Sequence, residues 1–319
     1  IKKQSQISAS MTSIESMNGT IFIGVNIGSV SVNVVACDEN GNLWLRKEAH
    51  SGKPAETLDK ILAEVYNNPN VVAYYSVAGS FGEISEIAAI EAGVRALGEE
   101  YDLIISLGGE SFVLYVLNGK GDIVNILSHD KCAAGSGEFF IQQIERLGLK
   151  LDEAIEKSKQ GKNIDLASRC SVYCKSDITH KLNKGEASIE DILTSVIYSM
   201  VNKVLALIFQ SRIDVKRMLI IGGVTLNDAF VKMLKQELKG VEVIYKDVSP
   251  VFEAFGTALL VKDSPKYTQP HLKSQKSFDY LPPLAEYQHL VKIIEEPQHK
   301  SKIDTNKEYI LGVDVGSTT

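Results

Sequence analysis

Three glycine-bearing turns at the ends of apolar strands constrain this chain more than any other feature of its sequence. The first is Gly28-Ser29, which follows an apolar run through Gly24; the second is Gly108-Gly109 and the third is Gly222-Gly223. Glycine lets backbone N–H groups approach an anion closely, so three such turns that meet in space would form a cradle for phosphate and nucleoside. A single Gly-Gly pair is more typical of an ordinary turn, so only the order and spacing of all three turns indicate a phosphate site.

Two stretches with the same layout are predicted to be β-hairpins. Residues 21–36 contain two apolar runs joined at Gly28-Ser29, and residues 103–117 contain two joined at Gly108-Gly109. Between residues 21 and 262, β-branched runs alternate with amphipathic segments, which is the pattern of an α/β fold with mixed sheets and flanking helices. Two hairpins of one layout predict two similar half-domains that face each other.

A long core helix is predicted in the second half of the chain. Ser188 and Asp191 form a capping box, and the apolar residues that follow keep the helical period. This helix leads to a strand over Met218–Ile221, then to the tight turn Gly222-Gly223, and then to a further helix that starts at about Asn227.

Composition along the chain predicts its organisation. We expect, in order, a mobile lead-in over 1–20, lobe I over 21–102, lobe II with the cysteine motifs over 103–252, a helix returning to lobe I over 253–262, a Pro-rich linker over 263–308, and the start of a second copy of the domain over 309–319. The second copy rests on an internal repeat of the six residues from Gly24 at Gly312, for which chance similarity is the alternative. Because the chain starts with Ile1 and stops within the repeated motif, we expect it to be a piece of a longer polypeptide.

Charge and missing motifs exclude several classes of protein. Lys and Arg number 34 against 40 Asp and Glu, so the net charge of −6 argues against nucleic acid as the main partner. The apolar stretches fall short of about 18 residues and no signal segment opens the chain, so we expect no membrane and a cytoplasmic protein. The sequence has no Walker A loop, no G-x-G-x-x-G and no G-x-S-x-G motif. Its four cysteines are too few for a disulfide scaffold.

Four further motifs narrow the prediction. They are KCAAGSG at 131–137, RCSVYCKSD at 169–177, LIIGGVTLN at 219–227 and FGTAL at 255–259. Together with the three turns, over roughly residues 21–262, they resemble the BadF/BadG/BcrA/BcrD ATPase family of the actin, Hsp70 and sugar kinase superfamily. That family includes activators of 2-hydroxyacyl-CoA dehydratases and subunits of benzoyl-CoA reductases, and the internal repeat is similar to its large tandem CoA-substrate-specific activases. The resemblance implies an actin-like (ribonuclease H-like) ATPase fold of two lobes.

The resemblance also implies cofactors and an assembly. ATP or ADP with Mg²⁺ would lie between the lobes, and a homodimer would share one [4Fe–4S] cluster. By motif position, the nucleotide-binding residues would be Gly28, Ser29, Val30, Gly108, Gly109, Gly135, Ser136, Gly137, Gly222, Gly223 and Asn227. Each subunit would supply Cys132 and Cys170, because such a cluster needs four thiolates. Both cysteines precede predicted helices, whose N-terminal dipoles favour thiolates.

The remaining cysteines and one histidine have plainer interpretations. Cys174 is four residues after Cys170, and a spare ligand, a disulfide partner or simple packing all stay open. Cys37 in the first hairpin is expected to be a buried small hydrophobe. His129, three residues before Cys132, is more typical of a surface or capping histidine than of a metal ligand.

Two departures from the family pattern bear on catalysis. Asn26 stands where the family's first turn carries an acid that the downstream repeat keeps as Asp314, and Ser106 stands at the acid position before the second turn. A carboxylate there orients the water shell of Mg²⁺ or the attacking water, which an amide or a hydroxyl does poorly. We hypothesise that this copy binds nucleotide weakly or not at all and that the following copy hydrolyses it. Asn26 and Glu110 are the remaining candidates for catalytic positions.

The function that these residues predict is that of an ATPase-type activator domain. It would couple nucleotide binding or hydrolysis to low-potential electron transfer through the cluster to a CoA-thioester dehydratase or reductase, with ferredoxin or flavodoxin as electron donor. The alternative is a degenerate, non-hydrolysing copy that dimerises or regulates the intact ATPase domain downstream, so whether this copy is an enzyme stays open. A small-molecule kinase ranks last, because no Asp lies in a plausible base position beside Gly108-Gly109.

Overall fold

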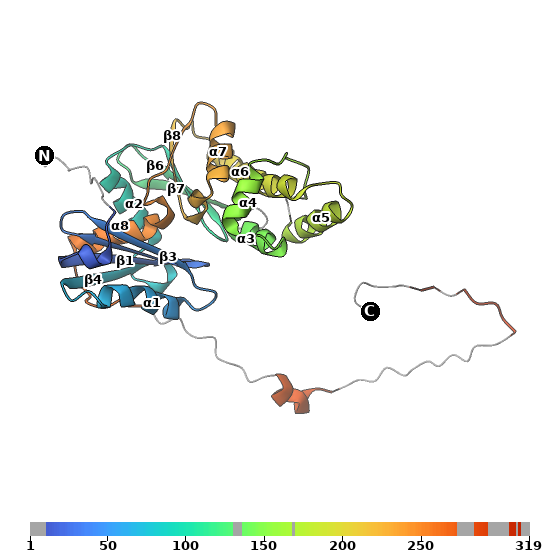
Figure 1. Ribbon diagram of the computed structural model, residues 1–319, viewed down its shortest axis with the longest axis horizontal. Coiled ribbons are helices and arrows are strands. Elements are labelled where there is room, and N and C mark those ends of the chain that lie inside the picture. Colours follow the sequence, from blue (N-terminus) through green and yellow to red (C-terminus); the bar gives the residue numbers. More distant parts are fainter. Residues whose placement is uncertain are drawn as a thin grey trace. The chain divides into compact units, whose positions relative to one another are not determined.

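The computed structural model contains two mixed β-sheets, and each sheet is the centre of one of two similar half-domains (Figure 1). It describes residues 11–129, 136–167, 170–272, 284–292, 306–310 and 312–313. The chain divides into one unit up to residue 275, called the body below, and a second unit over 276–319. In the described part of the second unit, the regular element is the 3-10 turn η5 (Leu284–Leu290). Asp314 lies outside the described residues.

The first sheet has the strand order β3-β2-β1-β4. Its strands are β1 (Gly19–Ile27), β2 (Ser31–Asp38), β3 (Leu43–Ala49) and β4 (Val71–Ala78). β1 pairs antiparallel with β2 and parallel with β4, which makes it a central strand. The hairpin predicted for residues 21–36 is thus confirmed.

Helices cover both faces of the first sheet, and β1 is therefore buried without interruption from Ile21 to Ile27. α1 (Pro54–Tyr66) packs on one face, and α8 (Phe252–Asp263) packs on the other beside α2 (Glu86–Leu97). In Figure 1 these helices lie on opposite sides of β1. Cys37, as predicted, is a buried apolar side chain beneath α8.

Gly24 is a packing residue under α8. A methyl group placed on Gly24 would lie 2.1 Å from the carbonyl oxygen of Ala254, so any side chain there would push the helix off the sheet. Gly24 was predicted together with the first turn, but it lies inside β1 and has no place in the turn itself.

Part of the expected lead-in belongs to the fold. The side chains of Ile14 and Met17 are 2% exposed, and the Asn68 side chain donates hydrogen bonds of 2.6 and 3.0 Å to their carbonyl oxygens. The short turn η1 (Ile14–Ser16) then leads into β1 at Gly19. Two buried apolar side chains therefore anchor residues 14–20 to the first half-domain, in contrast to the mobile segment that we expected.

The second sheet has the strand order β7-β6-β5-β8-β9. Its strands are β5 (Leu103–Leu107), β6 (Phe112–Leu117), β7 (Ile123–His129), β8 (Arg217–Ile221) and β9 (Glu242–Ile244). β5 pairs antiparallel with β6 and parallel with β8, so the second sheet repeats the arrangement of the first. The prediction of two similar half-domains is confirmed at the level of topology.

Helices of the second half-domain share one apolar core with this sheet. They are α3 (Gly137–Arg146), α4 (Leu151–Ser158), α5 (Ser171–Asn183), α6 (Ile189–Ser211) and α7 (Asp228–Glu237). α6 begins with the predicted capping box of Ser188 and Asp191. By length and composition alone, α6 could cross a membrane. Its apolar side chains between Ile192 and Leu207 are instead buried in this core, so α6 is a core helix of the second half-domain.

Short 3-10 turns complete the body. They are η2 (Gly79–Phe81) after β4, η3 (Gly223–Leu226) after β8 and η4 (Ser249–Val251) before α8. β4 is parallel to β1, and β8 is parallel to β5, so in each sheet the two strands end at the same edge. The loops that follow these four strands make up the candidate site.

Candidate functional site

The first two predicted turns have the same backbone geometry. In the β1–β2 turn, the Gly28 amide donates a hydrogen bond of 3.0 Å to the carbonyl oxygen of Ser31. In the β5–β6 turn, the Gly108 amide donates a bond of the same length to the carbonyl oxygen of Ser111. Each turn therefore leaves two residues at its tip, as in a tight hairpin.

The tips of these two turns meet although they belong to different sheets. A methyl group placed on Gly109 would lie 2.4 Å from Cγ2 of Val30 and 3.7 Å from Oγ of Ser29. A side chain at position 109 is thus excluded by the first turn. Glu110, at the same tip, is exposed. We name this meeting point the turn junction, formed by the tips at residues 29–30 and 109–110 together with the two elements described next.

The N-terminus of α3 is the third part of the turn junction. A methyl group on Gly137 would lie 3.1 Å from the carbonyl oxygen of Gly108, and the Glu138 amide donates a 2.8 Å hydrogen bond to the carbonyl oxygen of Gly109. Ser136 is buried and caps the helix by accepting a bond from the Phe139 amide. Gly135, also predicted as a nucleotide ligand, lies outside the described residues.

The third glycine turn brings the end of β8 to the same place. Gly222 has a φ of 91°, and a methyl group there would lie 2.5 Å from the carbonyl oxygen of Leu107. Both facts require glycine at position 222. Any other residue would be strained at this positive φ, and its side chain would clash with the backbone at the end of β5. A methyl group on the next residue, Gly223, would lie 3.2 Å from Nζ of Lys47 on β3. The glycine turn at Gly222-Gly223, which belongs to the second half-domain, thus lies against the Lys47 ammonium of the first half-domain.

Asn227, another predicted nucleotide ligand, has a structural task. Its side-chain oxygen accepts a 3.0 Å hydrogen bond from the Phe230 amide and so caps α7. The side chain is buried, and its nitrogen Nδ2 has no hydrogen-bond partner among the described residues. Only that nitrogen remains for a ligand.

A chain of hydrogen bonds, called the Lys47 network below, joins Lys47 to Asn26 beside the first turn. Lys47 Nζ donates to Ser31 Oγ at 2.8 Å and to Asn33 Oδ1 at 2.9 Å. Asn33 Nδ2 donates to Asn26 Oδ1 at 3.3 Å. Both asparagines are buried, and Nδ2 of Asn26 has no hydrogen-bond partner in the described part of the chain. Burial lowers the pKa of Lys47, and the carboxyl of Glu253 opposes that shift.

Ser106, which replaces the expected acid before the second turn, is in contact with an acid from another element. Its hydroxyl donates a 3.0 Å hydrogen bond to Oε1 of Glu253 on α8. Burial is the main cause that raises the pKa of Glu253, and Glu86 adds to the rise, while Ser106 and Lys47 oppose it. A carboxyl from α8 therefore lies beside Ser106, where we expected an acid on the strand itself.

The predicted cluster ligands are only partly described. Cys132 lies outside the described residues. Cys170 is partly exposed and is the N-cap residue of α5, which begins at Ser171. Cys174 is buried in the core of the second half-domain, which agrees with the packing interpretation. His129 is the last residue of β7.

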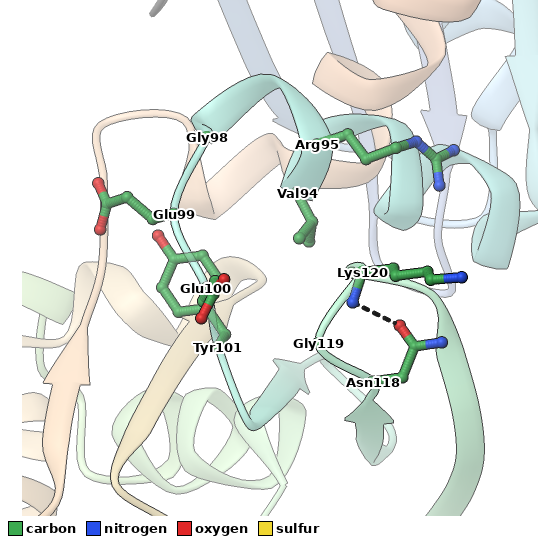
Figure 2. Close-up of a pocket in the computed structure, with 10 residues that line it drawn as sticks. Val94, Arg95, Gly98, Glu99, Glu100, Tyr101, Asn118, Gly119 and Lys120 are labelled. Atoms are coloured by element: carbon green, nitrogen blue, oxygen red, sulfur yellow. Dashed lines mark hydrogen bonds between the residues drawn. The ribbon is translucent and has the colours of Figure 1, made fainter.

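A partly open pocket lies away from these residues (Figure 2). It has a volume of about 290 Å³ and lies between the C-terminal end of α2, including Val94 and Arg95, and the β6–β7 loop with Asn118 and Lys120. The Lys120 amide donates a 2.9 Å hydrogen bond to Asn118 Oδ1 and closes that loop. None of the residues that line the cavity belongs to the glycine turns.

Sequence reasoning missed Lys47, Asn33 and Glu253. A signal for Asn33 was present, because it is a polar residue within the apolar strand β2. Lys47 lies in the polar second half of β3, and only the β2–β3 register shows that it is directly opposite Asn33. For Glu253 we find no such signal, because its contact with Ser106 joins residues 147 positions apart.

Comparison with known proteins gives one family. The sequence model of the BadF/BadG/BcrA/BcrD ATPase family matches residues 23–261. The chain is 30% identical over 226 residues to the 2-hydroxyisocaproyl-CoA dehydratase activator of Clostridioides difficile, covering 70% of this chain and 81% of that protein. It is 25% identical over 253 residues to the (R)-2-hydroxyglutaryl-CoA dehydratase activating ATPase of Acidaminococcus fermentans, covering 74% of this chain and 95% of that protein.

A solved structure has the same fold. The activator of the 2-hydroxyisocaproyl-CoA dehydratase from Clostridium difficile, determined with bound ADPNP, superposes with a TM-score of 0.67 at 23% identity. The superposition covers 86% of this chain and all of that one. The predicted actin-like ATPase fold of mixed sheets with flanking helices is thereby confirmed.

Proposed function

Since this chain belongs to the BadF/BadG/BcrA/BcrD ATPase family, we propose that it is a nucleotide-binding activator domain whose lobes respond to ATP. The response would drive low-potential electron transfer through a [4Fe–4S] cluster to an acyl-CoA dehydratase or reductase. The named relatives are activators of such dehydratases, and the related solved structure carries an ATP analogue.

The turn junction is the observation that carries this proposal. Two tight turns from different sheets touch at Val30 and Gly109, and the N-terminus of a helix joins them at Gly137. Glycine turns and a helix N-terminus present backbone N–H groups to phosphate. Because these elements come from both half-domains, a nucleotide bound at the junction would couple its phosphates to the relative position of the two halves.

The cluster would be held by Cys132 and Cys170 of each subunit of a homodimer. Cys170 fits such a role, since it is partly exposed and precedes the first turn of α5. When bound, a [4Fe–4S] cluster supplies one-electron chemistry at low potential. Ferredoxin or flavodoxin is the class of electron donor that we propose.

Oxygen-free purification tests the proposal. We expect iron and acid-labile sulfide in about a 4:4 ratio per dimer, and binding of a fluorescent ATP analogue that unlabelled ADP displaces. Colourless protein that still binds nucleotide would remove the electron-transfer part. Protein that holds a cluster but binds no nucleotide would remove the ATP-dependent part.

A second candidate function is that of a non-hydrolysing copy that dimerises with or regulates an intact ATPase domain. The observation that favours it is Asn26, whose amide replaces an acid and is bound into the Lys47 network instead of facing a water shell. A steady-state ATPase assay separates the two functions, with Asn26→Asp as a companion variant. Robust turnover by the natural chain that is lost on changing Asn26 would refute the degenerate site.

A further inference from the structure

The ammonium of Lys47, at one end of the Lys47 network, determines the orientation of the side-chain amides of Asn33 and Asn26. An ammonium group only donates hydrogen bonds, so the atom of Asn33 that faces Lys47 at 2.9 Å must be its oxygen. Its nitrogen then faces Asn26, whose own oxygen must accept that bond. The nitrogen of Asn26 is left at the far end.

The atom that the network leaves without a partner is therefore a donor. The oxygens of Asn26 and Asn33 already accept hydrogen bonds within the network, whereas Nδ2 of Asn26 is buried without a hydrogen-bond partner among the described residues. Lys47 has three N–H donors and uses two of them in the described contacts. Unsatisfied buried donors are costly, so a ligand that accepts hydrogen bonds is favoured here, and the charge of the ammonium favours one that is also an anion.

Lys47 forms no ion pair with the described residues. Its hydrogen-bond partners Ser31 and Asn33 are both neutral, and the carboxyl of Glu253 acts on its charge without direct contact. The ammonium is held beside the first turn by Ser31 and lies against Gly223 of the third turn. It is thus a fixed positive charge between two glycine turns that belong to different half-domains.

From this geometry we infer that Lys47 is the cation that this site uses for the nucleotide phosphates, and that di- or triphosphate binding here needs no divalent metal. The inference deepens the proposed function and rests on it. An ammonium can neutralise phosphate charge as a point charge, as lysines of other phosphate sites do. Mg²⁺ instead requires oxygen ligands and keeps part of its water shell.

The residues around Asn26 do not fit a divalent ion. Both amide oxygens are engaged, and an ammonium lies one residue away along the network. The carboxyl of Glu253 is bound to Ser106. The carboxylate of Glu86 lies near Asn26, because a methyl group on Gly79 would be 3.0 Å from Glu86 Oε1 and 3.5 Å from Asn26 Nδ2, but the Asn26 atom found there is a nitrogen donor, which cannot ligate a cation. Among the described residues, no group of three or more His, Cys, Asp or Glu side chains could hold a metal ion, so a divalent ion here would depend on the phosphates and water for most of its ligands.

Nucleotide titration with and without metal tests the inference. The full chain is titrated with a fluorescent ADP analogue in 5-fold excess Mg²⁺ or in excess EDTA, at the same ionic strength. We expect dissociation constants within about twofold of each other, because the ammonium is present in both. Lys47→Met should weaken binding about tenfold or more in both buffers, whereas Lys47→Arg should retain most of it.

A matched control separates charge from folding. Lys60 on α1 is also a lysine of the first half-domain, and it forms an exposed ion pair with Glu48 away from the turns. Lys60→Met should bind as the natural chain does. A converted site, Lys47→Met with Asn26→Asp, exchanges the ammonium and amide for a carboxylate, and its binding should become dependent on Mg²⁺.

The outcomes distinguish the inference from the function beneath it. Binding by the natural chain that disappears in EDTA overturns the role of Lys47 and leaves nucleotide binding intact. Binding by folded Lys47→Met equal to that of Lys60→Met also overturns it. If the natural chain binds nucleotide in neither buffer, the proposed function fails together with the inference.

Discussion

Ser106 Oγ donates a 3.0 Å hydrogen bond to Glu253 Oε1 and so joins the end of the second sheet to the helix that covers the first. The contact lies where we expected an acid on the strand. A carboxyl from α8 lies beside Ser106 there. This relationship, together with the Lys47 network, makes the site depend on the way the two half-domains pack.

The raised pKa of Glu253 predicts a pH dependence of stability. A carboxyl whose folded pKa is raised stabilises the fold fully below its unfolded pKa, and this stability is lost as the pH rises through the folded pKa. Glu253→Gln stays neutral at every pH and its side-chain oxygen can still accept from Ser106. We therefore expect the variant to lose less stability than the natural chain as the pH rises above 4.5, the ordinary pKa of a glutamate side chain.

Urea denaturation midpoints at a series of pH values measure this difference. Glu237→Gln, at an exposed position on α7, is the matched control and should follow the natural chain. A pH profile of Glu253→Gln that is parallel to that of the natural chain would show that Glu253 is solvated in the folded state.

Gly109→Ala should weaken both folding and nucleotide binding. The added methyl would lie 2.4 Å from Cγ2 of Val30, so the two turns must move apart. Overpacking of this kind costs about 1–3 kcal/mol of the free energy of unfolding. The double variant with Val30→Ala should recover part of the loss. Gly119→Ala, whose methyl would meet no atom within 4 Å, should have little effect, and an equal loss in both variants would count against the contact.

Gly24→Ala should be more damaging than Gly109→Ala. The neighbour of the new methyl is the backbone of α8, with the Ala254 carbonyl oxygen at 2.1 Å, and backbone cannot move aside as the Val30 side chain can. We expect a loss of about 3 kcal/mol in the free energy of unfolding, measured by urea denaturation. Stability close to that of the natural chain would mean that α8 does not pack directly on β1.

Cys170→Ser and Cys174→Ser should have different consequences. Cys170 is partly exposed at the N-cap of α5, so its replacement should remove iron and weaken the dimer while the fold persists. Cys174 is buried in the core, so a hydroxyl there should cost about 1–3 kcal/mol and leave the iron content of folded protein unchanged. Full iron content in Cys170→Ser, by iron and sulfide assay, would show that the ligand assignment is wrong.

Local pattern was enough to predict much of the fold. The hairpins at Gly28-Ser29 and Gly108-Gly109 and the capping box at Ser188 depend on neighbouring residues, so they could be predicted from residues within a few positions. The lead-in was assigned by its polarity, and its two anchoring residues, Ile14 and Met17, could not be recognised without the surface on which they pack.

By itself, the sequence determined the positions of the glycine turns, the order of strands and helices, and the family to which they belong, because these follow from spacing along the chain. Tertiary structure alone decided what surrounds those turns: that Lys47 faces Gly223, and that Glu253 reaches Ser106. The physical reason is that charge and hydrogen bonding at a site depend on distances in space, and those distances exist only once two separately formed sheets have packed together.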